Sequence, residues 1–245
     1  MLQMLNTPDV NISTIEDPIE YQIARINQTQ VKPDIGLTFS NGLRSLVRQD
    51  PDIIMVGEIR DGETASLAIN ASLTGHLVLS TLHTNSAAGT IPRLLDMGTE
   101  PFLVVSTINV IIAQRLVRRL CESKEKYNLS SAEIASLGKK VDLNRVLEAL
   151  RQENIVGPTD DWAKIPFYKP KATTESEDGY SGRVGIHEIL PMTLTIKELV
   201  MQGKTAEDIE TRAKSEGMLT MLEDGIFKSI QGLTTIEEVL RVVSE

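Results

Sequence analysis

The spacing of apolar and polar residues predicts an α/β protein. Residues 53–56 form an unbroken apolar run between Pro51 and Gly57. A short run of this kind, bounded by turn residues, is typical of a strand buried on both faces. Such strands belong to parallel sheets, whose ligands bind at the carboxyl ends of the strands. Residues 11–15 and 76–83 also favour strands, and apolar positions with helical spacing predict a helix over 38–48.

Charged residues follow directly after the strand predicted over 53–56. Glu58 and Arg60 stand at its carboxyl end, and Asp61 is the expected N-cap of the next helix. One interpretation is that Glu58 orients or deprotonates a water molecule near a Mg²⁺-bound phosphate. The other is a solvated acid at a strand end.

A second acidic pair, Glu16 and Asp17, stands at the carboxyl end of the strand predicted over 11–15. Mg²⁺ is usually held through one or two carboxylates together with phosphate and water. Glu16 and Glu58, from two strand ends, could therefore flank one metal-bound triphosphate. The alternative is a solvated turn that Pro18 ends.

Two histidines, His76 and His83, bracket the third predicted strand. Residues seven apart on a strand point to opposite faces, so this pair does not make a metal site by itself. Only His83 lies at the carboxyl end, where ligands bind. From the residues alone, each histidine is interpreted as a polar residue at a strand end and not as a ligand.

These segments resemble the secretion ATPases, the hexameric motors of type II secretion and type IV pilus assembly. Residues 47–61 match the signature of that family at every position, with Gly57 where other P-loop proteins carry Asp in the Walker B segment. Residues 13–21 match its acidic box and residues 74–85 its histidine box. The resemblance covers nearly the whole chain. It implies an incomplete three-layer RecA-like core, with ATP and Mg²⁺ as cofactors.

The resemblance also implies roles for individual residues. The expected catalytic residues are Glu58, Glu16 and His83. The expected nucleotide-binding residues are Glu16, Asp17, Gly57, Arg60, His76 and Thr84.

The phosphate-binding loop of the family has no match in the chain. Gly203-Lys204-Thr205 resembles its end, but Glu198 stands where the first glycine is needed and the preceding segment is predicted to be helical. The resemblance puts the first residue of the chain just after that loop. The expected function is the carboxyl-terminal portion of a motor ATPase. The alternative is an inactive fragment, or a structural subunit that binds no nucleotide within its own residues.

Three segments are expected along the chain. These are an ATPase core at 1–120, an irregular insert with two weak helices at 121–182, and a core-completing strand with a helical tail at 183–245. In assembly-type relatives the insert holds zinc through four cysteines. Only Cys121 is present here, and lysine at its partner position, Lys124, cannot replace a thiolate, so no zinc is expected.

Composition restricts the possible partners. A net charge of −9 argues against a nucleic-acid binder, which needs a basic face. A single cysteine excludes an internal disulfide framework and fits a reducing cytoplasm. By resemblance, the expected partners are further copies in a homo-hexamer and the inner-membrane platform proteins of a pilus or secretion machine. The chain is then expected to be cytoplasmic and peripheral at the inner face of the cytoplasmic membrane.

Overall fold

A computed structural model describes residues 2–174 and 176–244. The chain divides into two compact units. The first comprises Met1–Ile111 and Pro191–Arg212, and the second comprises Ile112–Leu190 and Ala213–Glu245. The segments predicted from the sequence end at residues 120 and 182. They were defined by motifs and composition, whereas these units are defined by compactness, so the predicted boundaries stay a prediction.

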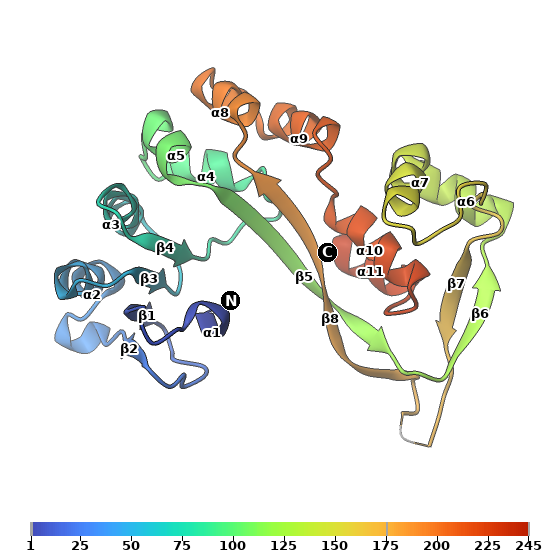
Figure 1. The fold of residues 1–245 in the computed structure, drawn as a ribbon, viewed down its shortest axis with the longest axis horizontal. Coiled ribbons are helices and arrows are strands. Elements are labelled where there is room, and N and C mark those ends of the chain that lie inside the picture. Colours follow the sequence, from blue (N-terminus) through green and yellow to red (C-terminus); the bar gives the residue numbers. More distant parts are fainter. Residues whose placement is uncertain (1, 175, 245) are drawn as a thin grey trace. The chain divides into compact units, whose positions relative to one another are not determined.

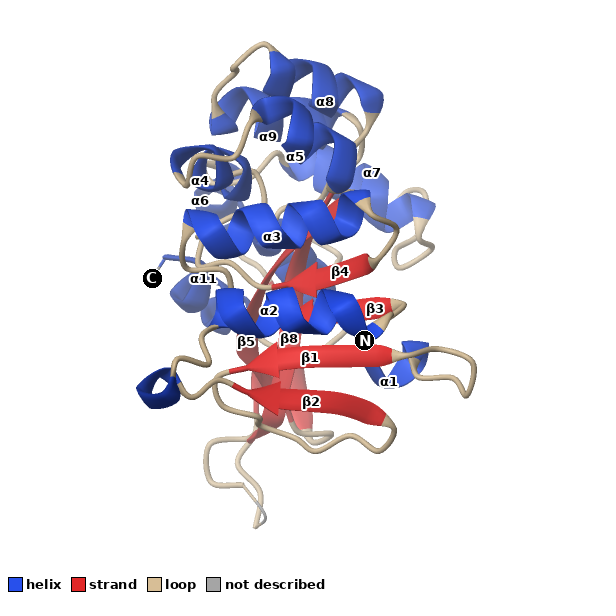
Figure 2. Ribbon diagram, turned by 90° about the vertical axis from the view of Figure 1, so that its left-hand side faces the viewer, coloured by secondary structure: helices blue, strands red, loops and turns tan. Residues whose placement is uncertain are grey.

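A four-stranded parallel sheet with the order β2-β1-β3-β4 lies at the centre of the first unit (Figure 2). Its strands are β1 (Ile12–Glu16), β2 (Ile26–Gln30), β3 (Ile53–Val56) and β4 (Leu77–Ser80). The apolar run at 53–56 is therefore a strand with parallel neighbours on both sides, as predicted. The register pairs Ile12 with Ile53 and Ile15 with Val56, so β1 and β3 end at the same level.

Two helices, α2 (Phe39–Leu46) and α3 (Gly62–Leu73), lie side by side on one face of this sheet (Figure 2). Helix α2 begins after Thr38, whose side chain accepts a hydrogen bond from the Asn41 amide. Its Gly42 faces β1, where an added Cβ would stand 2.3 Å from the Ile15 side chain. The absence of a side chain at this position allows close packing of helix and strand.

The remaining elements of the first unit are short. They are α1 (Leu2–Leu5), η1 (Pro33–Ile35), η2 (Val47–Gln49), α4 (Thr90–Asp96), α5 (Pro101–Thr107) and α8 (Leu194–Met201). Helix α9 (Ala206–Ser215) contains the boundary between the units.

In the second unit, a ribbon of two long strands packs against the last two helices (Figure 1). The strands are β5 (Val110–Leu120) and β8 (Tyr180–Pro191), and the helices are α10 (Met221–Ile230) and α11 (Ile236–Ser244). Val117, Ile186 and Val239 are buried between them. An added Cβ at Gly225 would stand 2.3 Å from Val239, so the two helices approach closely where glycine permits it.

The insert is more regular than the sequence predicts. Besides the two expected helices, α6 (Ser131–Gly138) and α7 (Leu143–Gln152), it contains an antiparallel pair, β6 (Lys124–Asn128) and β7 (Pro166–Pro170). The expectation of an irregular insert was wrong because β6 has no apolar alternation and obtains its partner from residues about forty positions away. Tyr127 pairs with Phe167 in this register, with ring centroids 6.3 Å apart.

Across the described residues, the helices are too short or too polar for any of them to span a bilayer.

A buried carboxylate, Glu238, connects α11 to β5. Its side chain is only 3% exposed and accepts hydrogen bonds from Arg118 Nη2 at 2.6 Å and from the Arg118 amide at 3.3 Å. Arg241 Nη2 donates to it from the same helix at 3.0 Å. These donors, Arg118 foremost, outweigh burial and lower the pKa of Glu238 to about 2. Arg118 is therefore paired with a buried acid, although its own side chain is about half exposed.

We predict that Glu238→Gln lowers the free energy of unfolding by about 2 kcal/mol at pH 7, because a buried charged hydrogen-bond network loses its acceptor. The pKa of Glu238 is depressed in the folded state. Its stabilising contribution is therefore complete above pH about 4.5, the ordinary value, and is lost as the pH falls to about 2. Urea unfolding followed by the fluorescence of Trp162, the single tryptophan, reports on the same unit.

The control is Glu237→Gln, which changes the neighbouring exposed acid and should shift stability by less than about 0.5 kcal/mol. The free energy of unfolding should differ less between Glu238→Gln and the native chain at pH 2.5 than at pH 7. An equally large difference at both pH values would contradict the stabilising role of the ionised Glu238 carboxylate.

Candidate active site at the carboxyl edge of the parallel sheet

Three strand ends of the first unit are joined at Gly57. Its amide donates to the Ile15 carbonyl at 2.7 Å, and an added Cβ would lie 3.2 Å from that carbonyl oxygen. From the end of β4, Thr81 Oγ1 donates to the Gly57 carbonyl at 2.6 Å, and the Ile59 amide donates to the Thr81 carbonyl at 2.9 Å. The loop that carries Glu58 is thereby fixed against β1 on one side and against the end of β4 on the other.

Glu58 lies at the centre of a cluster of charged side chains. Arg60 donates a short hydrogen bond to Glu58 Oε1, and His83 Nε2 lies 3.1 Å from Glu58 Oε2. Arg60 also forms a long ion pair with Asp17 at 4.0 Å. The Glu58 side chain is 12% exposed, whereas that of His83 is 87% exposed. The carboxylate is therefore enclosed at its base and contacted by groups that reach solvent.

The cluster favours the ionised form of Glu58. The hydrogen bond from Arg60 is the main cause that lowers the pKa of this carboxyl, and the contact with His83 acts in the same direction, against the opposing effect of burial. The pKa of Arg60 is raised in turn by Glu58. A carboxylate held in this way accepts hydrogen bonds well and takes up a proton only weakly at neutral pH.

Glu16 is buried at the end of β1 and has partners of its own. Its Oε1 accepts from Thr14 Oγ1 at 2.5 Å and from Gln28 Nε2 at 2.9 Å. Thr14 and Gln28 face each other in the β1–β2 register. The sequence reasoning did not identify these two supporting residues. Their polar character inside a strand pair was the available signal.

The remaining predicted residues, Thr84 and His76, lie at opposite ends of β4. Thr84 follows His83 in the loop after β4, where its hydroxyl lies 3.0 Å from Thr90 Oγ1. His76 lies at the opposite end of β4, and its Nδ1 contacts the Ala71 carbonyl at 2.8 Å at the end of α3. The structure thus gathers Asp17, Gly57, Glu58, Arg60 and His83 at one edge. It does not bring His76 to them.

The segment Gly203-Lys204-Thr205 follows a helix, as predicted, and it caps the next helix. Helix α8 precedes it, Gly203 adopts a positive φ of 67°, and Thr205 Oγ1 accepts from the Asp208 amide at 3.2 Å at the start of α9. Its backbone therefore serves a helix-turn-helix connection and does not follow a strand.

Residues 1–241 match the model of a protein family described as "Type II/IV secretion system protein". The chain belongs to this family. It is 52% identical over its full length to a type II secretion system protein E from Xanthomonas campestris pv. campestris. Over 98% of its length it is 46% identical to a type IV pilus assembly ATPase from Thermus thermophilus. The family predicted from the sequence motifs is confirmed.

Solved structures bear out the predicted fold class. The structure of the pilus retraction motor PilT with bound ADP covers 98% of the chain with a TM-score of 0.65 and 27% identity. The ATPase DotB of Legionella pneumophila covers 98% with a TM-score of 0.59 and 22% identity. These neighbours have RecA-like P-loop folds, and the first unit is an α/β domain of that class.

The relatives are longer than this chain. It spans 40% of the Xanthomonas protein, 25% of the Thermus protein and 55% of the PilT chain.

We predict that Arg60→Gln raises the pKa of Glu58 toward its ordinary value of 4.5, because the main donor to the carboxylate is lost. The measurement is a pH titration of the side-chain carboxyl carbons by NMR. Arg44→Gln is the matched control, since Arg44 pairs with Glu63 at 2.6 Å in an exposed contact. An unchanged Glu58 titration in Arg60→Gln would mean that Arg60 does not hold the carboxylate.

Proposed function

We propose that this chain supplies the hydrolytic part of the nucleotide site in a motor ATPase of type II secretion or type IV pilus assembly. The observation that carries the proposal is the Glu58 cluster. An enclosed carboxylate lies at the carboxyl edge of a parallel sheet, bonded to Arg60 and His83. Ligands of open α/β folds bind at this edge, and family membership supports a phosphorylated nucleotide as the ligand.

In this proposal Glu58 orients the water molecule that attacks the γ-phosphate. The lowered pKa of its carboxyl keeps it ionised, so it accepts a hydrogen bond from water and acts as a weak proton acceptor. Positioning and charge stabilisation account for most of the catalysis in phosphoryl transfer, so a weak base suffices. Arg60 and His83 carry donors that can turn from Glu58 to phosphate oxygens, since both side chains are more than half exposed.

Glu16 and Asp17 supply oxygen atoms suited to Mg²⁺ or to its water ligands. Within 2–174 and 176–244, no three His, Cys, Asp or Glu side chains come together as a complete metal site. Mg²⁺ in nucleotide sites usually takes only one or two carboxylates and completes its shell with phosphate and water. Two acids beside a phosphate fit that mode. The ion would neutralise phosphate charge when bound.

ATP is the proposed nucleotide. The PilT structure is described with bound ADP, and four relatives are named as type IV pilus assembly ATPases. In the proposed site, Gly57, Arg60 and Thr84 contact the nucleotide from the loops after β3 and β4, and His83 senses the γ-phosphate. His76 is the weakest of the predicted nucleotide contacts because it lies at the other end of β4.

A structural subunit without nucleotide binding of its own is the second candidate. The observation that favours it is the helix-capping role of Gly203-Lys204-Thr205, the one Gly-Lys-Thr sequence in the 245 residues. In this case the chain would contribute only packing surface to a ring of subunits.

The proposed assembly is a homo-hexamer that acts on the platform proteins of a pilus or secretion machine, at the inner face of the cytoplasmic membrane. No nucleic-acid partner is proposed, because the net charge is −9.

The experiment replaces the matching segment of the Xanthomonas relative with this chain, which is 52% identical to it over 245 residues. We predict that the chimera hydrolyses ATP and that Glu58→Gln lowers kcat by about 100-fold or more, because the oriented water is lost. ATP binding should remain, since the substitution keeps the size of the side chain.

Glu63→Gln is the control, because Glu63 is an exposed acid in the first turn of α3. Its kcat should stay within about twofold of the chimera. A folded chimera that binds ATP without hydrolysing it would favour the structural subunit, and full activity of Glu58→Gln would overturn the role of Glu58.

A further inference from the structure

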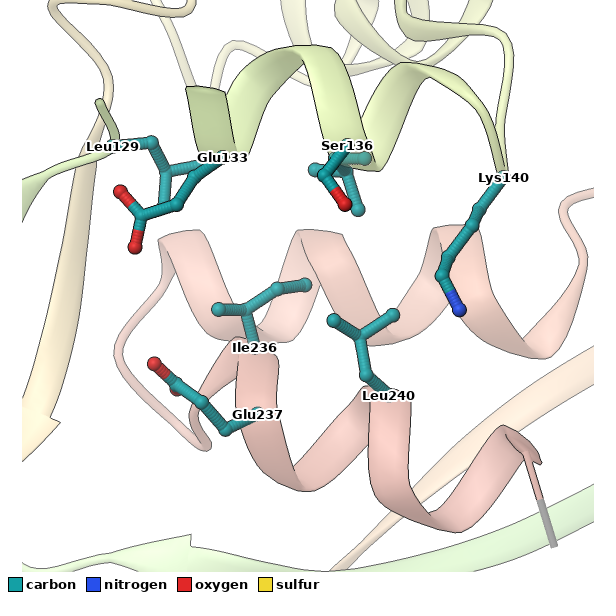
Figure 3. Close-up of a pocket in the computed structure, with 8 residues that line it drawn as sticks. Leu129, Glu133, Ser136, Lys140, Ile236, Glu237 and Leu240 are labelled. Atoms are coloured by element: carbon teal, nitrogen blue, oxygen red, sulfur yellow. The ribbon is translucent and has the colours of Figure 1, made fainter. Parts of the chain in front are cut away.

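Helices α6 and α11 of the second unit enclose a small groove (Figure 3). Its volume is about 150 Å³, which is well below that of a metabolite pocket and suits a single side chain. The apolar part of its lining comes from Leu129 and Leu137 on one side and from Ile236 and Leu240 on the other. The groove can therefore cover the aliphatic stem of an inserted side chain.

The two ends of the groove differ in charge. Glu133 of α6 and Glu237 of α11 lie at one end, and Lys140 lies at the other (Figure 3). The Ser130 amide donates to Glu133 Oε2 at 2.8 Å, and hydrogen bonds from Ser130, its hydroxyl first, lower the pKa of Glu133. One carboxylate is thus ionised and held in place by a helix cap, and the second comes from a different helix.

These two carboxylates lack a strong cationic partner. Neither forms an ion pair with a described residue. The ammonium group of Lys169 acts on Glu133 electrostatically, but it lies over the Tyr127 ring at 4.4 Å from the centroid. The Tyr127 hydroxyl is buried beside them and interacts with Glu237. Burial, together with Glu237 and Glu133, raises its pKa. Two carboxylates that form no ion pair with a described residue therefore meet at this end, beside a buried phenol.

We propose that the groove binds an arginine side chain of a partner protein. The aliphatic stem lies on Ile236 and Leu240, and the guanidinium lies between Glu133 and Glu237. Arginine fits better than lysine because its planar group can donate to two carboxylates at once. The acidic end disfavours anionic lipids and nucleic acids.

The test uses n-butylguanidinium, which reproduces the stem and head of arginine, and its neutral isostere n-butylurea. Methyl resonances of Leu129, Leu137, Ile236 and Leu240 are followed by NMR in the 245-residue chain. We predict saturable binding of butylguanidinium at millimolar concentration, at least fivefold tighter than that of butylurea. Sodium chloride should weaken it, because screening reduces attraction between exposed charges. Equal binding of the two compounds, or no saturable shift at these methyl groups, would overturn the proposal.

Glu133→Gln with Glu237→Gln should weaken butylguanidinium binding about tenfold and leave butylurea unchanged. Glutamine at position 133 preserves the helix cap, so the groove should keep its shape. Glu148→Gln, an exposed acid on α7, is the control and should bind both compounds as the native chain does. If the double variant binds butylguanidinium as tightly as the native chain, the two carboxylates do not hold the cation. If instead the double variant loses its native methyl spectrum, the effect of sodium chloride on butylguanidinium binding to the native chain is the deciding measurement. Binding that sodium chloride does not weaken would overturn the role of the two carboxylates.

Discussion

The parallel pairing of β1 with β3 is the constraint on which the candidate site depends. Their register ends both strands at one level, and Gly57 allows the backbones to approach where a side chain would crowd the Ile15 carbonyl. Glu16 and Glu58 belong to segments far apart in the sequence, and only this pairing brings them to one edge of the sheet. A larger residue at position 57 would move the Glu58 loop and disturb the site without removing a charged group.

The same edge combines two requirements that conflict chemically. In the function proposed above, Glu58 has to be ionised and oriented before a nucleotide binds, and the contacts with Arg60 and His83 favour that state. With a phosphate bound, the same donors would be more useful on the phosphate oxygens. The exposure of their side chains allows that exchange, whereas the enclosed base of Glu58 keeps the carboxylate where it is. The site therefore pairs one fixed group with two movable ones.

The sequence predicted most of the first unit, because its signals are local. The apolar run at 53–56, the cap Asp61 and the acids at strand ends are each predicted from a few neighbouring residues. The Arg118–Glu238 pair, the β6–β7 pairing and the support of Glu16 by Gln28 could not be read in this way. They join residues between 12 and 120 positions apart, and no pattern among neighbouring residues records which distant segment supplies the partner.

The hydrophobic core of the second unit has a consequence for how this protein can be altered. Leu150, Ile165 and Phe167 of the insert pack in one cluster with Ile226 and Phe227 of α10. Lys124 also donates to the Gly232 carbonyl at 2.6 Å. The insert is therefore not a detachable loop. An exchange of this module between relatives must carry the final helices with it, and changes in the two segments should be inherited together.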